Sequence, residues 1–224
     1  MTAQHVLPLR TAKPGQVQVW DPFVRIFHWS LIAAFAIAYL TEDEALALHV
    51  WAGYAVGGLV VLRIVWGFAG PAHARFSDFV YPPSVALCYL RDLLHFKSRR
   101  YLGHSPAGGA MVIALLLGLS ALVGSGLATY AVRNNAGPLA GIVTAQTSVI
   151  RAARADDERA QPGTEQRKAK PGRAWKEVHE FLANLVLGLA GVHVLGVLLA
   201  SLAHRENLAL AMITGRKRAE DAGP

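Results

Sequence analysis

Two histidines, His179 and His193, stand fourteen residues apart near and within an apolar stretch that carries no charge from Phe181 to Ala203. Fourteen steps of about 100° return to within about 40° of the starting direction, so both imidazoles face the same side of one helix, about 21 Å apart along its axis. Such a helix contributes one ligand to each of two metal centres at different depths. Each centre needs a second ligand, and two other apolar segments offer His28 and His49.

The composition indicates a membrane protein. Hydrophobic residues make up 53% of the chain and charged residues 17%, whereas a soluble domain usually carries about 25% charged residues. Several apolar runs approach or exceed the roughly 20 residues that cross a hydrocarbon core. We therefore predict an all-α integral membrane four-helix bundle. The expected helices are residues 23–41, 45–68, 107–132 and 177–203.

The remaining segments divide the chain around this single transmembrane domain, 23–204. Residues 1–22 form an N-terminal arm and 205–224 a basic tail. The connection from about Ala69 to Gly103 mixes aromatic, aliphatic and basic residues, which suits a segment lying among lipid headgroups. The long loop 133–176 includes a polar stretch, Arg151–Gly172, for which we predict no regular structure.

The distribution of basic residues predicts the orientation. If the N-terminus is cytoplasmic, twelve Lys and Arg lie inside, and the short Thr41–Glu44 turn outside is acidic. The long third loop then places nine basic residues outside, but long loops weigh less in the positive-inside rule. We expect both termini in the cytoplasm. The formal net charge of +7 then complements anionic lipid, and no motif resembles a nucleic-acid-binding one.

This topology pairs the four histidines by depth. His28 lies near the inner end of the first helix, twelve residues or about 18 Å before Leu40, while His49 begins the second helix on the outer side. The fourth helix runs inward, so His179 is the outer of its two histidines and His193 the inner one. We therefore pair His49 with His179 and His28 with His193.

Two imidazoles alone within a bilayer fit haem better than zinc or copper. Zinc and copper sites take three or four protein ligands, often thiolate or carboxylate, and the chain has one cysteine. A porphyrin supplies four of the six ligands of its iron, so two axial histidines suffice. Gly53, Gly57, Gly188 and Gly191 would clear space for a macrocycle, although close helix packing through small residues explains them equally well. The sequence predicts two haem b groups with His28, His193, His49 and His179 as the iron ligands.

Several motifs agree with this interpretation and carry a family resemblance. They are Arg25-Ile26-Phe27-His28-Trp29, His49 with Gly53, Arg63 with Trp66-Gly67, Ala74-Arg75-Phe76-Ser77-Asp78-Phe79 and Arg100-Tyr101-Leu102-Gly103-His104-Ser105-Pro106. Together they resemble the bacterial cytochrome b561 family, in particular the cytochrome b subunits of nickel-iron hydrogenases, over roughly Val17 to Arg216. The resemblance implies a four-helix bundle in the bacterial inner membrane, with two b haems between the helices, that passes electrons between quinone and a redox partner. The third connection is longer and more charged than this resemblance predicts.

Two arginines are candidates for contact with the haem. Arg63 lies within the second helix, where a buried cation needs a partner, and a haem propionate provides one. The alternative is that Arg63 extends to the membrane interface. Arg25 could likewise meet a propionate or anchor the first helix.

His104 and Ser105, at the inner interface, are candidates for a quinone site. Quinol oxidation releases protons, and histidine titrates near neutral pH. The structural alternative makes Ser105 the N-cap and Pro106 the first residue of the third expected helix.

The leading function is electron transfer across the membrane between ubiquinone or menaquinone and a partner such as a hydrogenase, a dehydrogenase or a c-type cytochrome, by a chain that could form a homodimer. An alternative within the same family is a superoxide oxidase that reduces ubiquinone, with the basic third loop as a cationic funnel. A protein without haem that uses its histidines for protons or metal ions is the third possibility.

Overall fold

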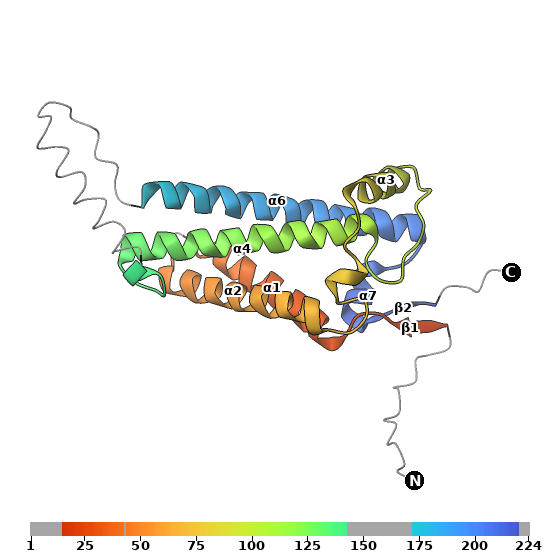
Figure 1. Cartoon of the computed structure of the whole chain (residues 1–224), viewed down its shortest axis with the longest axis horizontal. Coiled ribbons are helices and arrows are strands. Elements are labelled where there is room, and N and C mark those ends of the chain that lie inside the picture. Colours follow the sequence, from red (N-terminus) through yellow and green to blue (C-terminus); the bar gives the residue numbers. More distant parts are fainter. Residues whose placement is uncertain (1–14, 43, 143–171, 220–224) are drawn as a thin grey trace, which may run out of the picture. The chain divides into compact units, whose positions relative to one another are not determined.

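The computed structural model describes residues 15–42, 44–142 and 172–219. Four long helices dominate it (Figure 1). They are α1 (Pro22–Leu40), α2 (Leu46–Ala69), α4 (Pro106–Asn134) and α6 (Arg173–His204). The shorter elements are β1 (Gln16–Gln18), a 3₁₀ turn (Phe76–Asp78), α3 (Pro83–Leu94), α7 (Leu208–Thr214) and β2 (Arg216–Arg218).

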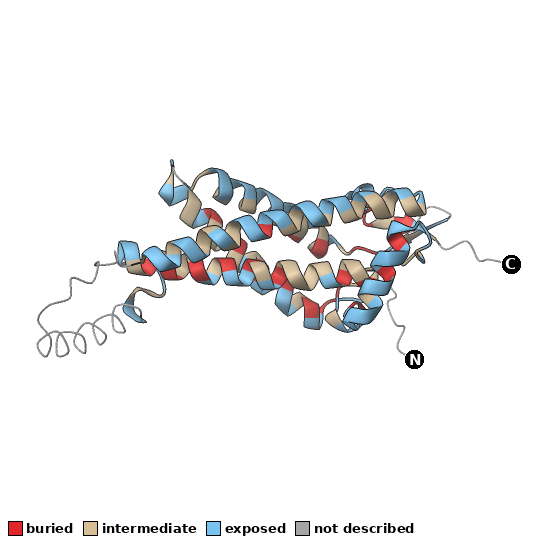
Figure 2. Ribbon diagram, turned by 90° about the horizontal axis from the view of Figure 1, so that it is seen from above, coloured by how far each residue is buried: buried red, intermediate tan, exposed pale blue. Residues whose placement is uncertain are grey.

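All four long helices are long and apolar enough to cross a membrane. Within each helix, an 18-residue stretch has a mean hydropathy between 1.6 and 2.3. The protein itself buries only 6 to 22% of the residues in these stretches. Figure 2 shows this as long stretches of exposed and intermediate residues along the helices. So many exposed apolar side chains would be unfavourable in water, and they indicate that the helices are surrounded by lipid. The predicted all-α membrane bundle is confirmed.

The ends of the helices differ slightly from the predicted ranges. The largest difference is in α6, which begins at Arg173 rather than at residue 177. Two ion pairs with i, i+4 spacing support this extra turn: Arg173 Nε with Glu177 Oε1 at 2.8 Å, and Lys176 Nζ with Glu180 Oε1 at 2.7 Å. The expectation for Arg151–Gly172 falls outside the described residues, apart from Gly172 itself.

The chain divides into two compact units. The first unit comprises Met1–Ser30, Leu62–Ile113 and Val192–Pro224, and the second comprises Leu31–Val61 and Ala114–Gly191. Each long helix contributes one end to each unit. Of the four histidines, His28 and His193 fall in the first unit, and His49 and His179 fall in the second.

A two-stranded clasp joins the chain ends in the first unit. β1 pairs antiparallel with β2, with Val17 opposite Lys217 (Figure 1). Gly215 ends α7 in the left-handed conformation at φ 80°, and its carbonyl oxygen accepts hydrogen bonds from the backbone of Val19 and Trp20. An apolar core beside the clasp includes Val19, Trp20, Val24, Ala74 and Ala211. From the sequence, we predicted only an arm and a tail for these two segments.

The starts of α1 and α4 are capped as their sequences suggest. Asp21 Oδ1 accepts a hydrogen bond from Val24 N at 3.0 Å, with Pro22 as the first residue of α1. Ser105 Oγ accepts one from Gly108 N at 3.2 Å, with Pro106 as the first residue of α4. Ser105 therefore serves as a helix cap, in agreement with the structural alternative.

Candidate functional site: two histidine pairs

In the second unit, His49 of α2 and His179 of α6 face each other. Their ring centroids are 6.0 Å apart, and the planes of the rings are inclined at 84°. His49 Nδ1 lies 2.8 Å from the carbonyl oxygen of Ala38, and His179 Nδ1 lies 3.1 Å from that of Leu122. A carbonyl oxygen only accepts hydrogen bonds, so each Nδ1 carries the proton and each Nε2 keeps a lone pair for a metal.

Two small residues of α4 make room for His179. A Cβ added at Gly126 would lie 2.9 Å from His179 Cε1, so the imidazole occupies the space beside this glycine. Ser125 is buried, and its Oγ lies 3.1 Å from His179 Nδ1 while donating to Leu122 O at 2.9 Å. Neither residue was predicted from the sequence as part of the site.

The first unit contains the other predicted pair. The ring centroids of His28 in α1 and His193 in α6 are 6.4 Å apart, and the ring planes are inclined at 61°. The Trp29 ring lies edge-on to His28 at 5.2 Å. The Nδ1 atom of His28 is buried and has no hydrogen-bond partner among the described residues. The structure thus brings together the partners in both pairs that the sequence analysis predicted by depth.

Both distances fit an iron atom between two imidazoles. Two rings that bind one metal from opposite sides, each through a bond of about 2 Å, have centroids roughly 6 Å apart. Among the described residues, no group of three or more histidine, cysteine, aspartate or glutamate side chains gathers in a way that could hold a metal without a porphyrin. The donor set therefore fits haem, whose macrocycle supplies the other four ligands.

The four glycines near the histidines do not all have the same role: some leave space for a macrocycle, and one allows close packing of helices. A Cβ at Gly53, Gly188 or Gly191 would meet no atom within 4 Å, which leaves open space beside the helix backbone. Gly57 instead packs against Val123 of α4, with 3.1 Å to Val123 Cγ1. Three of the four glycines thus match clearance for a macrocycle, and Gly57 matches close helix packing.

Arg63 and Arg25 lie in the first unit with the His28–His193 pair. Arg63 is only 3% exposed, and its Nη1 has no partner among the described residues. Its guanidinium lies 5.5 Å and 5.8 Å from the ring centroids of Phe76 and Phe79. Arg63 is therefore enclosed by protein, unlike a residue that extends to the interface. Arg25 Nη1 donates to Thr214 O at 2.9 Å, and its buried Nε is unpartnered within the described part of the chain.

His104 lines a cavity of about 400 Å³ in the first unit. Other walls come from His73, Phe79, Tyr81 and Tyr101. The His104 ring lies 4.4 Å from Phe79 and 4.7 Å from Trp20, measured between centroids. Burial, followed by the charges of Arg63 and Lys217, lowers the pKa of His104 to about 3. The imidazole is thus neutral at physiological pH and differs from a histidine that titrates near neutrality.

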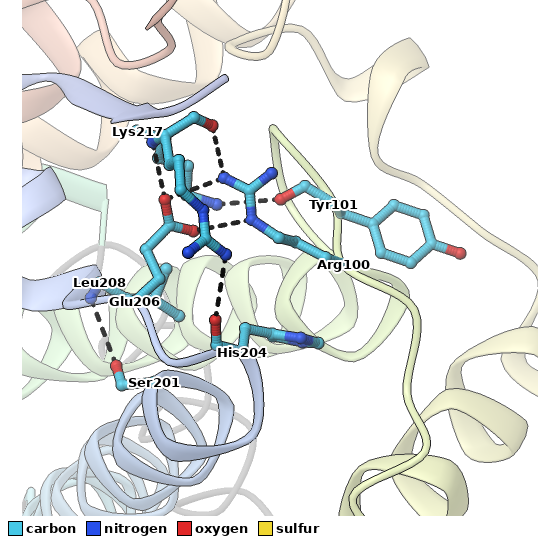
Figure 3. Close-up of polar contacts among 8 residues, drawn as sticks. Arg100, Tyr101, Ser201, His204, Glu206, Leu208 and Lys217 are labelled. Carbon is cyan, nitrogen blue, oxygen red and sulfur yellow. Dashed lines mark hydrogen bonds and ion pairs between the residues drawn. The ribbon is translucent and has the colours of Figure 1, made fainter. Parts of the chain in front are cut away.

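An ion-pair cluster fixes the segment before His104 to the C-terminal end of the chain (Figure 3). Arg100 binds Glu206 through two nitrogens, at 2.9 Å and 3.1 Å, and also donates to the backbone oxygen of Arg218 at 2.6 Å. Glu206 accepts a further hydrogen bond from Arg218 N at 2.8 Å. The buried Lys217 donates to Tyr101 O at 3.0 Å, while the Tyr101 ring points away from the cluster (Figure 3).

Comparison with known proteins identifies the family. The model of the family described as prokaryotic cytochrome b561 matches residues 19–215. No curated protein and no solved structure matches the chain significantly. The match covers all four long helices and all four paired histidines. The chain belongs to the prokaryotic cytochrome b561 family, whose members are helical membrane proteins that bind b-type haem and transfer electrons.

Proposed function

We propose that this protein is a diheme cytochrome b of the bacterial inner membrane that transfers electrons between the quinone pool and a redox partner of a respiratory chain. The two histidine pairs, with centroids 6.0 Å and 6.4 Å apart, carry this proposal. His28 and His193 hold one haem b, and His49 and His179 hold the other. Haem supplies reversible one-electron chemistry at its iron when it is bound.

Two histidines on each iron favour a relay over ligand chemistry, because six ligands leave no open position on the metal. The residues of the chain therefore orient the group, exclude water and tune its potential. In the second unit, the Ala38 and Leu122 carbonyls hold the two rings through Nδ1–H and leave Nε2 free. This backbone support makes the orientation of each ligand independent of the bound group.

The cavity beside His104 is our candidate for the quinone site. Phe79, Tyr81 and Tyr101 provide aromatic walls for a flat ring. His104 Nδ1, buried without a partner within the described residues, can hydrogen-bond an oxygen of the quinone head group. Because Ser105 Oγ already caps α4, we assign the quinone contact to His104 and a supporting role to Ser105.

The clasp between β1 and β2 supports an orientation with both termini on one side of the membrane. The basic residues of the C-terminal segment favour the cytoplasmic side for this end of the helices. The redox partner that we propose is a hydrogenase, a dehydrogenase or a c-type cytochrome, and a homodimer is compatible with this assignment. The basic loop on which the superoxide-oxidase alternative rests lies mostly outside the described residues.

Anaerobic mixing of purified oxidised protein with a quinol, such as decylubiquinol or menadiol, tests this function. The haem absorption should change to that of the reduced form, and addition of the matching quinone to reduced protein should reverse the change. A His104→Phe variant should react more slowly at unchanged haem content, whereas His95→Phe, at an exposed position after α3, should react as the wild type does. Protein that dithionite reduces but that exchanges no electrons with either quinol or quinone would contradict the proposal. Quinone reduction that depends on superoxide would instead favour the alternative.

A further inference from the structure

The two charged side chains that are fully buried among the described residues are both cations. Arg63 is 3% exposed and Lys217 is 7% exposed. Within the described part of the chain, neither has a carboxylate within ion-pair distance, and Lys217 has only the Tyr101 carbonyl as a hydrogen-bond acceptor. A buried charge without a counter-charge is costly, so a protein that keeps two of them needs anionic groups nearby.

Arg63 and Lys217 belong to one continuous cluster of the first unit. Phe79 contacts both the Arg63 guanidinium, at 5.8 Å, and the His104 ring, at 4.4 Å. The Trp20 ring also lies 4.7 Å from the His104 ring, and Lys217 Nζ is 5.9 Å from the Trp20 ring. Each cation is therefore linked to His104 through one aromatic side chain.

Two nitrogens of this cluster are unoccupied. Arg63 Nη1 and His104 Nδ1 are both buried, and neither has a hydrogen-bond partner among the described residues. Glu206 and Asp21 attract Lys217 and Arg63 respectively, but only from beyond ion-pair distance. An acceptor with negative charge would satisfy Arg63 Nη1 and balance the charges of both cations.

The cluster lies beside the helix that carries His28. Asp21, at the start of α1, accepts a hydrogen bond from Trp66 Nε1 at 3.5 Å, and Trp66 follows Arg63 by three residues in α2. Asp21, Arg25 and His28 have the i, i+4, i+7 spacing that places residues on one helix face, with about 10 Å of rise from first to last. Arg63 is thus linked through Trp66 to the start of α1, and His28 lies about two helical turns further along α1.

We propose that Arg63 and Lys217 bind the two propionate carboxylates of the haem held by His28 and His193, and that their charges raise the reduction potential of that haem. This inference rests on the proposed function, and it adds a residue of the C-terminal strand to the haem site. Reduction adds an electron to the iron, so nearby positive charges favour the reduced form. The clasp between β1 and β2 positions Lys217 for this task.

Redox titration of the purified holoprotein, followed by its absorption spectrum, tests the inference. Lys217→Met should lower the potential of one haem and leave the other unchanged, and Lys217→Arg should keep both potentials close to wild type. In a His49→Ala background only the His28–His193 haem should remain, and the same downward shift should appear there. Arg63→Met should act on the same haem and in the same direction.

Arg218→Met is the matched control. Its side chain is exposed on the same strand and makes a long hydrogen bond, 3.5 Å from Nη2 to His204 O, whereas its bonds with Arg100 and Glu206 are made by its backbone. Unchanged potentials in Lys217→Met at full haem content, or an equal shift in Arg218→Met, would overturn the inference while leaving the proposed function intact. Haem loss that Lys217→Arg does not restore would also overturn it, because the role would then be packing rather than charge. Wild-type protein without haem would contradict the proposed function and this inference with it.

Discussion

The His179 imidazole lies against a helix position where only glycine fits: a Cβ on Gly126 would lie 2.9 Å from His179 Cε1. At this position α4 also offers His179 Nδ1 a carbonyl oxygen, from Leu122, and a hydroxyl group, from Ser125. The ring is thus oriented by another helix rather than by its own. Such support is what a metal ligand requires, because the outer partners of a ligating histidine set its tautomer and direction.

Gly126→Ala should displace the His179 ring and reduce haem bound at the His49–His179 pair. The added methyl group cannot be accommodated unless the imidazole or α4 moves, so we expect haem affinity at this pair to fall roughly 10- to 100-fold. The measurement is haem per polypeptide, together with the reduced-minus-oxidised spectrum. Gly124→Ala is the control, since a Cβ there meets no atom within 4 Å. Equal haem content in both variants would show that His179 does not need this space.

Glu206→Gln should destabilise the protein and reduce its sensitivity to acid. The Glu206 carboxylate is 10% exposed and binds Arg100, so its loss should cost about 2 kcal/mol. Although burial raises the pKa of Glu206, its hydrogen bonds from Arg100 and Arg218 N outweigh this and hold the pKa below its ordinary value of 4.5. The unfolded chain therefore binds the proton first, and this stabilisation is lost as the pH falls below about 4.5.

Thermal unfolding in detergent between pH 3 and 7 measures both effects. Wild type should lose more stability than Glu206→Gln below about pH 4.5. Glu180→Gln, which breaks an exposed ion pair with Lys176, should unfold at a temperature close to that of the wild type. A parallel decline of wild type and Glu206→Gln with acid would contradict the prediction.

His104→Gln should make the stability of the folded protein less dependent on pH between pH 7 and 4. Burial lowers the pKa of His104 from 6.5 to about 3, so between these values the unfolded chain binds a proton that the folded chain does not. The stabilisation from His104 is complete above pH 6.5 and declines as the pH falls toward 3. The difference between wild type and His104→Gln in thermal unfolding between pH 7 and 4 checks this. His95→Gln, at an exposed site, should follow the wild-type curve.

The histidine pairing was predictable from the sequence because helix periodicity and span direction are enough to match residues by depth. Arg63 was also identified, since a charge within an apolar run stands out. The β1–β2 clasp was not predictable, because three-residue strands such as Gln16–Gln18 and Arg216–Arg218 are too short and too polar to show an alternating pattern. Lys217 consequently looked like one more basic residue of a tail, although the structure buries it. The role of Gly126 could not be recognised from the sequence, because α4 contains several glycines and only the position of the His179 ring distinguishes this one.

The role of the two histidine pairs as haem ligands is best tested by the haem content per polypeptide, measured with the dithionite-reduced minus oxidised spectrum. We expect two b-type haems in the wild type and one in each of His49→Ala and His28→Ala. His95→Ala, which replaces an exposed histidine outside both pairs, should retain two. A well-folded wild type with no haem, or a His49→Ala variant that keeps both, would contradict the assignment of the two pairs.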